Sequence, residues 1–150
     1  MISKVLVILW QCVIFLFSAQ PAADSKSLSN GLTEMVLEFL FPDMTPQRVA
    51  EIAEMLSFTV RKGAHFTIYF ILGALMYNCI LRSCKFAKAR LMSFVFCVLY
   101  AVTDEIHQIF VAGRAGRILD VCIDSFGNLC GIFVVWIVIN VIKNRKQPSL

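Results

Sequence analysis

The chain has 150 residues, of which 59% are hydrophobic and 16% charged, and its mean hydropathy is +0.76. A soluble domain of this size has too little interior to bury so much apolar surface, so the composition indicates a polytopic membrane protein. The same composition excludes intrinsic disorder and a disulfide-rich secreted scaffold. It also excludes a dedicated nucleic-acid binder, because the net charge of +4 follows from the membrane topology described below.

Four apolar stretches are long enough to cross a bilayer, which requires about 20 mostly apolar residues per helix. We place these spans near residues 2–19, 64–81, 91–110 and 121–142. The first stretch ends like a secretory signal peptide, but Pro21 suits a cleavage site poorly, so we keep it as a span. The sequence therefore predicts an all-α protein, an integral membrane four-helix bundle that forms one domain over residues 1–150.

The segment between the first two spans has helical periodicity of its own. Apolar residues recur at helical spacing over residues 32–40 and again over 49–60. Thr45 and Pro46 are a suitable cap and first-turn pair for the second of these stretches. We expect two short amphipathic helices here, which lie on the outer leaflet or fold back against the bundle as a lid.

The distribution of Lys and Arg predicts the orientation, because short loops that stay in the cytoplasm collect basic residues. One side holds eight basic residues and no acid: Lys4, Arg82, Lys85, Lys88, Arg90, Lys143, Arg145 and Lys146. The other side holds six basic residues and all ten acids. We therefore expect a multi-pass protein of the cell membrane with both termini in the cytoplasm.

Polar residues share one helical face on each of three spans. With the glycines on the same faces, they are Lys62, His65, Tyr69 and Gly73 for the second span, Tyr100, Asp104, His107 and Gln108 for the third, and Asp120, Asp124, Gly127, Asn128 and Gly131 for the fourth. The helical rise places these groups toward the outer side of the membrane, beneath a loop that carries Arg114 and Arg117. Gly127 and Gly131 allow close helix packing, so we expect the three polar faces to meet in an outward-facing pocket.

These residues carry a resemblance to a known family. The resemblance rests on Trp10 with Phe17-Ser18-Ala19-Gln20-Pro21, on Arg61-Lys62-Gly63-Ala64-His65-Phe66 with Tyr69, and on Asp104-Glu105-Ile106-His107-Gln108-Ile109-Phe110 followed by Gly113-Arg114 and Asp120. In this combination the chain resembles the VanZ-like family. The resemblance implies a small membrane protein of the bacterial cell envelope, whose founding member is linked to glycopeptide resistance, chiefly to teicoplanin.

Two functional hypotheses stay open at this point. In the first, the protein is an enzyme of the outer leaflet, in which Asp104 and His107 supply a base and an acid and Glu105 assists from the adjacent face. In the second, the same pocket captures a lipid-linked envelope precursor or a lipoglycopeptide without turnover. For either one, the candidate ligand-binding residues are Arg61, Lys62, His65, Tyr69, Gln108, Arg114, Arg117, Asp120 and Asp124.

Three further interpretations are weaker. A zinc or manganese site is compatible with the donors of His65, His107, Asp104, Asp120 and Asp124, but the spacing does not demand a metal, so we expect no cofactor. The polar residues could instead serve only to fix helix packing. A transporter is also disfavoured, because the sequence has no internal repeat that would support alternating access. The six cysteines form no metal-binding spacing and are interpreted as small buried hydrophobic residues. The partners we expect are membrane lipids and no nucleic acid.

Overall fold

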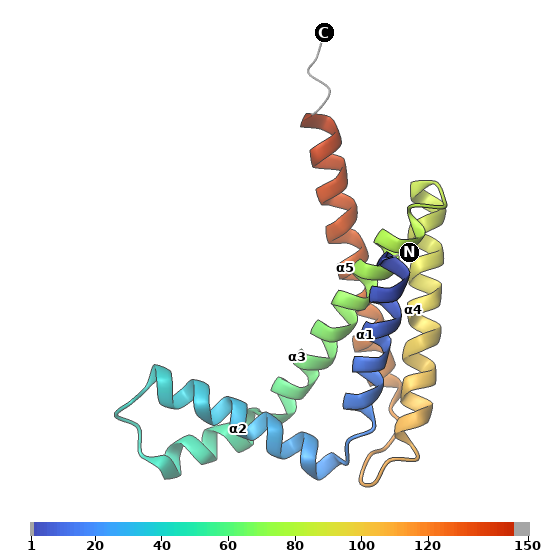
Figure 1. Ribbon diagram of the computed structural model, residues 1–150. Helices are drawn as coiled ribbons and strands as arrows, with labels where there is room; N and C mark the ends of the chain where they lie inside the picture. The colour runs from blue at the N-terminus through green and yellow to red at the C-terminus, as the bar shows by residue number, and fades with distance from the viewer. Residues whose placement is uncertain (1, 146–150) are drawn as a thin grey trace.

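The computed structural model describes residues 2–145 and confirms that the chain is all-helical (Figure 1). Its helices are α1 (Ile2–Ser18), α2 (Ala22–Leu40), α3 (Pro46–Ile80), α4 (Phe86–Gln108) and α5 (Ile118–Arg145). Residues 2–145 contain no strand. Met1 and residues 146–150, which include the predicted cytoplasmic Lys146, lie outside the described residues.

Three of the helices are long and apolar enough to cross a membrane, namely α3, α4 and α5. A fourth crossing is counted only when α1 and α2 are taken together, and these two helices meet at an angle of 103°. The 17 residues of α1 alone reach about 25 Å at 1.5 Å per residue, somewhat less than a hydrocarbon core of about 30 Å. The described residues thus contain three or four helices that are able to cross a membrane, which is compatible with a multi-pass membrane protein.

The segment after α1 folds as a helical hairpin and differs from the expected pair of short helices. α2 begins at Ala22, well before the first apolar stretch that we recognised. The second expected helix is not separate, because α3 runs without a break over 35 residues from the amphipathic stretch into the span. No proline follows Pro46 in α3, and Gly63 has open space around it, so nothing interrupts the helix. Figure 1 shows the hairpin projecting sideways from the other helices, so it does not cover them as a lid.

α3 and α5 pack closely along a row of glycines. A Cβ atom on Gly127 would lie 2.5 Å from the carbonyl oxygen of Phe66, and one on Gly131 would overlap the carbonyl oxygen of Phe70. No residue larger than glycine fits this spacing. The expected role of Gly127 and Gly131 in close helix packing is therefore confirmed.

Side-chain hydrogen bonds hold α1 against α3 and α4. The indole Nε1 of Trp10 donates to the carbonyl oxygen of Ile68 at 2.8 Å. The hydroxyl of Tyr100 donates to the carbonyl oxygen of Gln11 at 2.7 Å. In Figure 1 the start of α1, the α3–α4 turn and the last turn of α5 lie toward one end of the molecule. The α1–α2 corner and the α4–α5 loop lie together at the other end.

Candidate functional site

The last two turns of α4 bury three polar side chains, those of Asp104, Glu105 and Gln108, each at most 5% exposed. Asp104 Oδ2 accepts a hydrogen bond from the Tyr69 hydroxyl at 2.9 Å and another from Gln108 Nε2 at 3.2 Å. The hydroxyl comes from α3, so this carboxylate joins two helices. A buried carboxylate without such donors would destabilise the fold. Tyr69, which supplies one of them, is itself fully buried.

Arg114 fastens the α4–α5 loop to the corner between α1 and α2. Its Nε donates to the carbonyl oxygen of Gln20 at 2.9 Å and its Nη2 to that of Phe17 at 3.2 Å. Its Nη1 donates to Gln108 Oε1 at 2.9 Å. A guanidinium provides such a fork of donors, and a cation is favourable beside the free carbonyls at the end of a helix. Burial lowers the pKa of the Arg114 guanidinium, while the carboxylate of Asp104 opposes that shift.

Glu105 positions the start of α5. Its Oε1 accepts a hydrogen bond from the backbone N–H of Arg117 at 2.7 Å. Because this bond uses the backbone of Arg117, the guanidinium of that residue remains available. Among residues 2–145, no carboxylate forms an ion pair with Arg117 or with Arg61.

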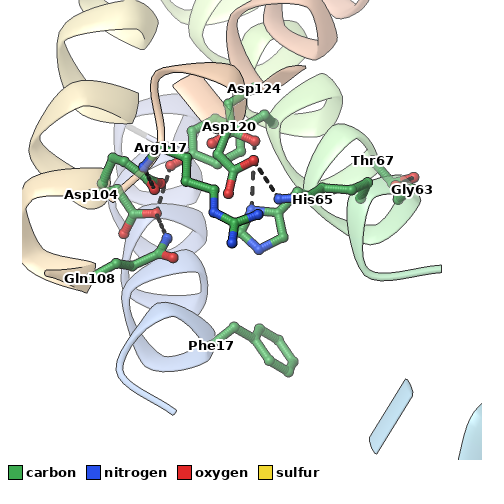
Figure 2. A network of polar contacts seen from close by, with 12 residues as sticks. Phe17, Gly63, His65, Thr67, Asp104, Gln108, Arg117, Asp120 and Asp124 are labelled. Atoms are coloured by element: carbon green, nitrogen blue, oxygen red, sulfur yellow. Dashed lines mark hydrogen bonds and ion pairs between the residues drawn. The ribbon is translucent and has the colours of Figure 1, made fainter. Parts of the chain in front are cut away.

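Two pairs of opposite charge join α3 to α5. The ammonium group of Lys62 forms a salt bridge with Asp120. One turn deeper, His65 Nδ1 lies 3.6 Å from Asp124 Oδ1, and the Asp124 side chain is only 1% exposed. Figure 2 shows His65, Asp120 and Asp124 close together, with Asp104 and Gln108 of α4 facing them. The polar faces of the three helices therefore meet, as the sequence predicted.

A cavity of about 220 Å³ opens beside these pairs, and we call it the basic pocket. It is lined by Ala22, Ser25, Phe58, Arg61, Lys62, His65, Gln108, Gly113, Arg114, Ala115, Arg117 and Asp120. Four cationic side chains and a single carboxylate face this space. The other three acids of the site lie behind its wall and do not line it. The pocket can therefore hold an anion, with guanidinium groups as its hydrogen-bond donors.

Most of the predicted site residues come together at this pocket. Seven of the predicted residues line it: Arg61, Lys62, His65, Gln108, Arg114, Arg117 and Asp120. Four more contact the lining residues or one another from behind: Tyr69, Asp104, Glu105 and Asp124. His107 is the exception.

His107 points away from the pocket and toward α1. Its ring stacks on Phe15 with 4.6 Å between the ring centroids and 28° between the ring planes. Among the described residues, no hydrogen bond or ion pair connects it to Asp104, so the predicted acid–base pair does not form. The reason is helical geometry: a step of three residues turns a side chain about 60° from Asp104, whereas a step of four turns Gln108 about 40° the other way. α1 occupies the side that His107 faces.

Comparison with known families identifies the chain. The VanZ/LLP1 family matches residues 4–140, which is most of the sequence. The chain belongs to the VanZ/LLP1 family. No curated protein and no solved structure shows significant similarity to it. The match extends over all five helices, so the basic pocket of this VanZ/LLP1 protein is built from residues inside the family region.

The metal hypothesis finds no cluster of donors in this VanZ/LLP1 protein. Among residues 2–145, no three His, Cys, Asp or Glu side chains come close enough together to hold a metal ion. His107 lies apart from the other proposed ligands, for the reason given above.

Sequence reasoning missed the contribution of α2 to the pocket. Ala22 and Ser25, in the first turn of α2, line the cavity. The backbone N–H of Ala22 donates to the carbonyl oxygen of Ala112 at 3.1 Å, which ties the start of α2 to the α4–α5 loop. Pro21 is a signal for the start of α2 in the sequence, since proline favours the start of a helix. The long-range partner Ala112 left no signal in the sequence.

Proposed function

We propose that this VanZ/LLP1 protein captures an anionic ligand of the cell envelope, lipid-linked or derived from the cell wall, in the basic pocket. The observation that carries the proposal is the pair of guanidinium groups of Arg61 and Arg117, which line the cavity without a carboxylate partner among the described residues. Unpaired guanidinium groups in a partly enclosed space favour phosphate or carboxylate ligands, because each presents a planar fork of donors.

We further propose that the pocket faces the cell exterior and that α1, α3, α4 and α5 cross the membrane as a four-helix bundle. The basic residues at 82–90, in the α3–α4 turn and the start of α4, and the basic end of α5 lie at the end of the molecule opposite to the pocket (Figure 1). By the distribution of positive charge, that end stays in the cytoplasm together with both termini. A ligand then reaches the pocket from the outer leaflet.

The hairpin of α2 and the start of α3 fits the membrane interface. The large apolar side chains of α2 that are exposed lie on one helical face: Leu28, Leu32, Met35, Val36, Phe39 and Leu40. Since α2 meets α1 at 103°, this helix runs nearly at right angles to a span. We propose that the apolar face rests on the outer leaflet and that the base of the hairpin forms one wall of the pocket.

The size of the cavity limits the ligand. Sites that enclose a drug-sized molecule measure about 300–1,000 Å³. At about 220 Å³, the basic pocket accommodates an anionic head group and not an entire lipoglycopeptide. A link to teicoplanin tolerance would then act through an envelope lipid and not through enclosure of the drug.

Catalysis by Asp104 and His107 is disfavoured because the two side chains face different helices. A second candidate function, an enzyme that uses other residues, is favoured by one observation. His65 lines the pocket and has a buried carboxylate, that of Asp124, beside its Nδ1. A histidine oriented by a buried carboxylate is a recurrent arrangement in acid–base catalysis.

Lipid analysis of the purified protein tests the capture. We expect an anionic lipid to copurify with the wild-type protein, and mass spectrometry should show at least tenfold less of it with Arg61→Ala or Arg117→Ala. One hydrogen bond to a charged group contributes about 1.5–3 kcal/mol, which corresponds to tenfold or more in affinity.

Arg48→Ala is the matched control, since Arg48 is an exposed arginine of α3 that lies outside the pocket and faces Glu51. Equal lipid content in all four proteins would refute the proposed capture. A companion measurement in a susceptible Gram-positive host asks whether expression raises the inhibitory concentration of teicoplanin. We expect Arg61→Ala and Arg117→Ala to abolish any rise at equal membrane abundance, and no rise with the intact protein would refute the resistance link.

A further inference from the structure

His65 has the position of a general base in the pocket. Its side chain is 22% exposed, and it shares the lining of the cavity with Arg61, Gln108 and Arg117. Its Nδ1 is directed at Asp124 at 3.6 Å, and this nitrogen is shielded from solvent. Figure 2 shows the other ring nitrogen directed away from Asp124. The distance of 3.6 Å between His65 Nδ1 and Asp124 Oδ1 is compatible with a catalytic role, because catalytic hydrogen bonds are often long in sites without a bound substrate.

The carboxylate of Asp124 has no other partner to satisfy it. Neither of its oxygens has a hydrogen bond from any described residue, and the residue is fully buried. The neighbouring acid, Asp120, is already paired with Lys62. Asp124 is therefore free to orient the imidazole of His65 and to stabilise the imidazolium that forms when His65 accepts a proton.

The cations around His65 suit a phosphate group. Phosphoryl transfer depends mainly on positioning and on positive charge around the phosphate oxygens. Arg61 and Arg117 supply that charge from two different elements and have no carboxylate partner among residues 2–145. Because Arg114 is held by three hydrogen bonds to the chain, these other two arginines are the donors that remain for a ligand.

Cavity size and leaving-group chemistry narrow the ligand further. A volume of about 220 Å³ corresponds to about seven water molecules, given that one water occupies about 30 Å³ in the liquid. This space admits more than one phosphate. Among the described residues that line the pocket, no ammonium or carboxyl group is free to protonate a departing alkoxide, because Lys62 is held by Asp120. A departing phosphate is stable as an anion and needs no such proton.

From this arrangement we propose that His65, oriented by Asp124, is the general base for hydrolysis of the terminal phosphate of a lipid diphosphate. The inference rests on the proposed capture of an anionic lipid in the same pocket. His65 Nε2 takes a proton from water as the water oxygen bonds to the terminal phosphorus. The bond from that phosphorus to the bridging oxygen breaks, and its electron pair stays on the bridging oxygen. The products are a lipid monophosphate and inorganic phosphate, and His65 returns its proton to solvent.

Phosphate release from geranylgeranyl diphosphate in phosphatidylcholine vesicles tests the reaction with the full-length protein. We expect His65→Ala to lower kcat by about 10²–10⁴-fold, the usual contribution of a positioned base, and added imidazole to restore part of it. We expect Asp124→Asn to lower kcat by a similar factor with little change in KM, as befits a positioning residue. Arg61→Ala should instead raise KM. Thr67→Ala, an exposed position of α3 outside the pocket, is the matched control and should keep wild-type rates.

The outcomes separate this reaction from simple capture. Saturable binding of the diphosphate lipid without phosphate release would overturn the hydrolysis and leave the proposed capture intact. Release that persists in His65→Ala would overturn the assignment of the base. Equal turnover of inorganic diphosphate would overturn the lipid specificity. Neither binding nor release would overturn both proposals.

Discussion

At the scale of single residues, Arg114 shows that the sequence can predict a residue of the pocket without predicting all that the residue does there. The sequence marked it as a ligand-binding cation because it follows the polar stripe of α4. Its three hydrogen bonds reach Phe17, Gln20 and Gln108, two of them more than 90 residues away. Such partners depend on the bend between α1 and α2, which local sequence pattern does not reveal. Arg114 therefore holds the pocket together as well as lining it.

Replacing Arg114 tests this holding role. We expect Arg114→Ala to lower the free energy of unfolding by about 2 kcal/mol or more, since it removes hydrogen bonds from a charged donor to three partners. Arg114→Lys should restore little of that loss, because an ammonium group lacks the planar fork. Thermal unfolding in detergent measures both variants. Full recovery with lysine would show that charge alone matters and would contradict the geometry described.

Tyr69 offers a second test at this scale. We expect Tyr69→Phe to cost about 1–3 kcal/mol of stability, because the buried carboxylate of Asp104 loses its donor from α3. The double variant Tyr69→Phe with Asp104→Leu should cost less than the two single changes added together. Chemical unfolding of the four proteins gives the coupling energy. Strict additivity would mean that the hydrogen bond contributes nothing.

At the scale of helices, sequence periodicity and apolar length predicted the membrane-capable parts of α3, α4 and α5, because the bilayer imposes both. Sequence periodicity and apolar length did not predict the helix boundaries where a helix continues beyond its apolar stretch. α3 starts 18 residues before the predicted span at residue 64, since an amphipathic stretch and a span can share one unbroken helix. The orientation of His107 was wrong for a related reason. Two residues of one polar stripe can face different neighbours, and only the position of α1 decides which.

The glycine row between α3 and α5 leads to a prediction about helix packing. We expect Gly131→Ala to destabilise the protein by about 1–3 kcal/mol, because its Cβ would overlap the backbone of Phe70 and the two helices would have to separate. Gly63→Ala is the control, since nothing lies within 4 Å of the added atom. That variant should be about 0.5–1 kcal/mol more stable, as alanine favours a helix over glycine. Melting temperatures in detergent compare the two, and equal effects would contradict the close packing of α3 and α5.

At the scale of the whole molecule, the convergence of three polar faces could be predicted, because each face was visible as a helical stripe and small residues allowed close packing. The shape of the pocket could not be predicted from the sequence. Its walls include the start of α2, which the chain brings back beside the α4–α5 loop through a backbone contact between Ala22 and Ala112. Function at this scale depends on which side of the membrane that pocket faces.

Thiol labelling of intact cells measures that orientation directly, in a protein whose six native cysteines have been replaced. Ala115→Cys places a thiol in the lining of the basic pocket, and Ser83→Cys places one in the α3–α4 turn at the opposite end. We expect a membrane-impermeant maleimide to label Ala115→Cys in intact cells and Ser83→Cys only after the membrane is opened. The reverse pattern would put the pocket in the cytoplasm and contradict capture of an outer-leaflet ligand.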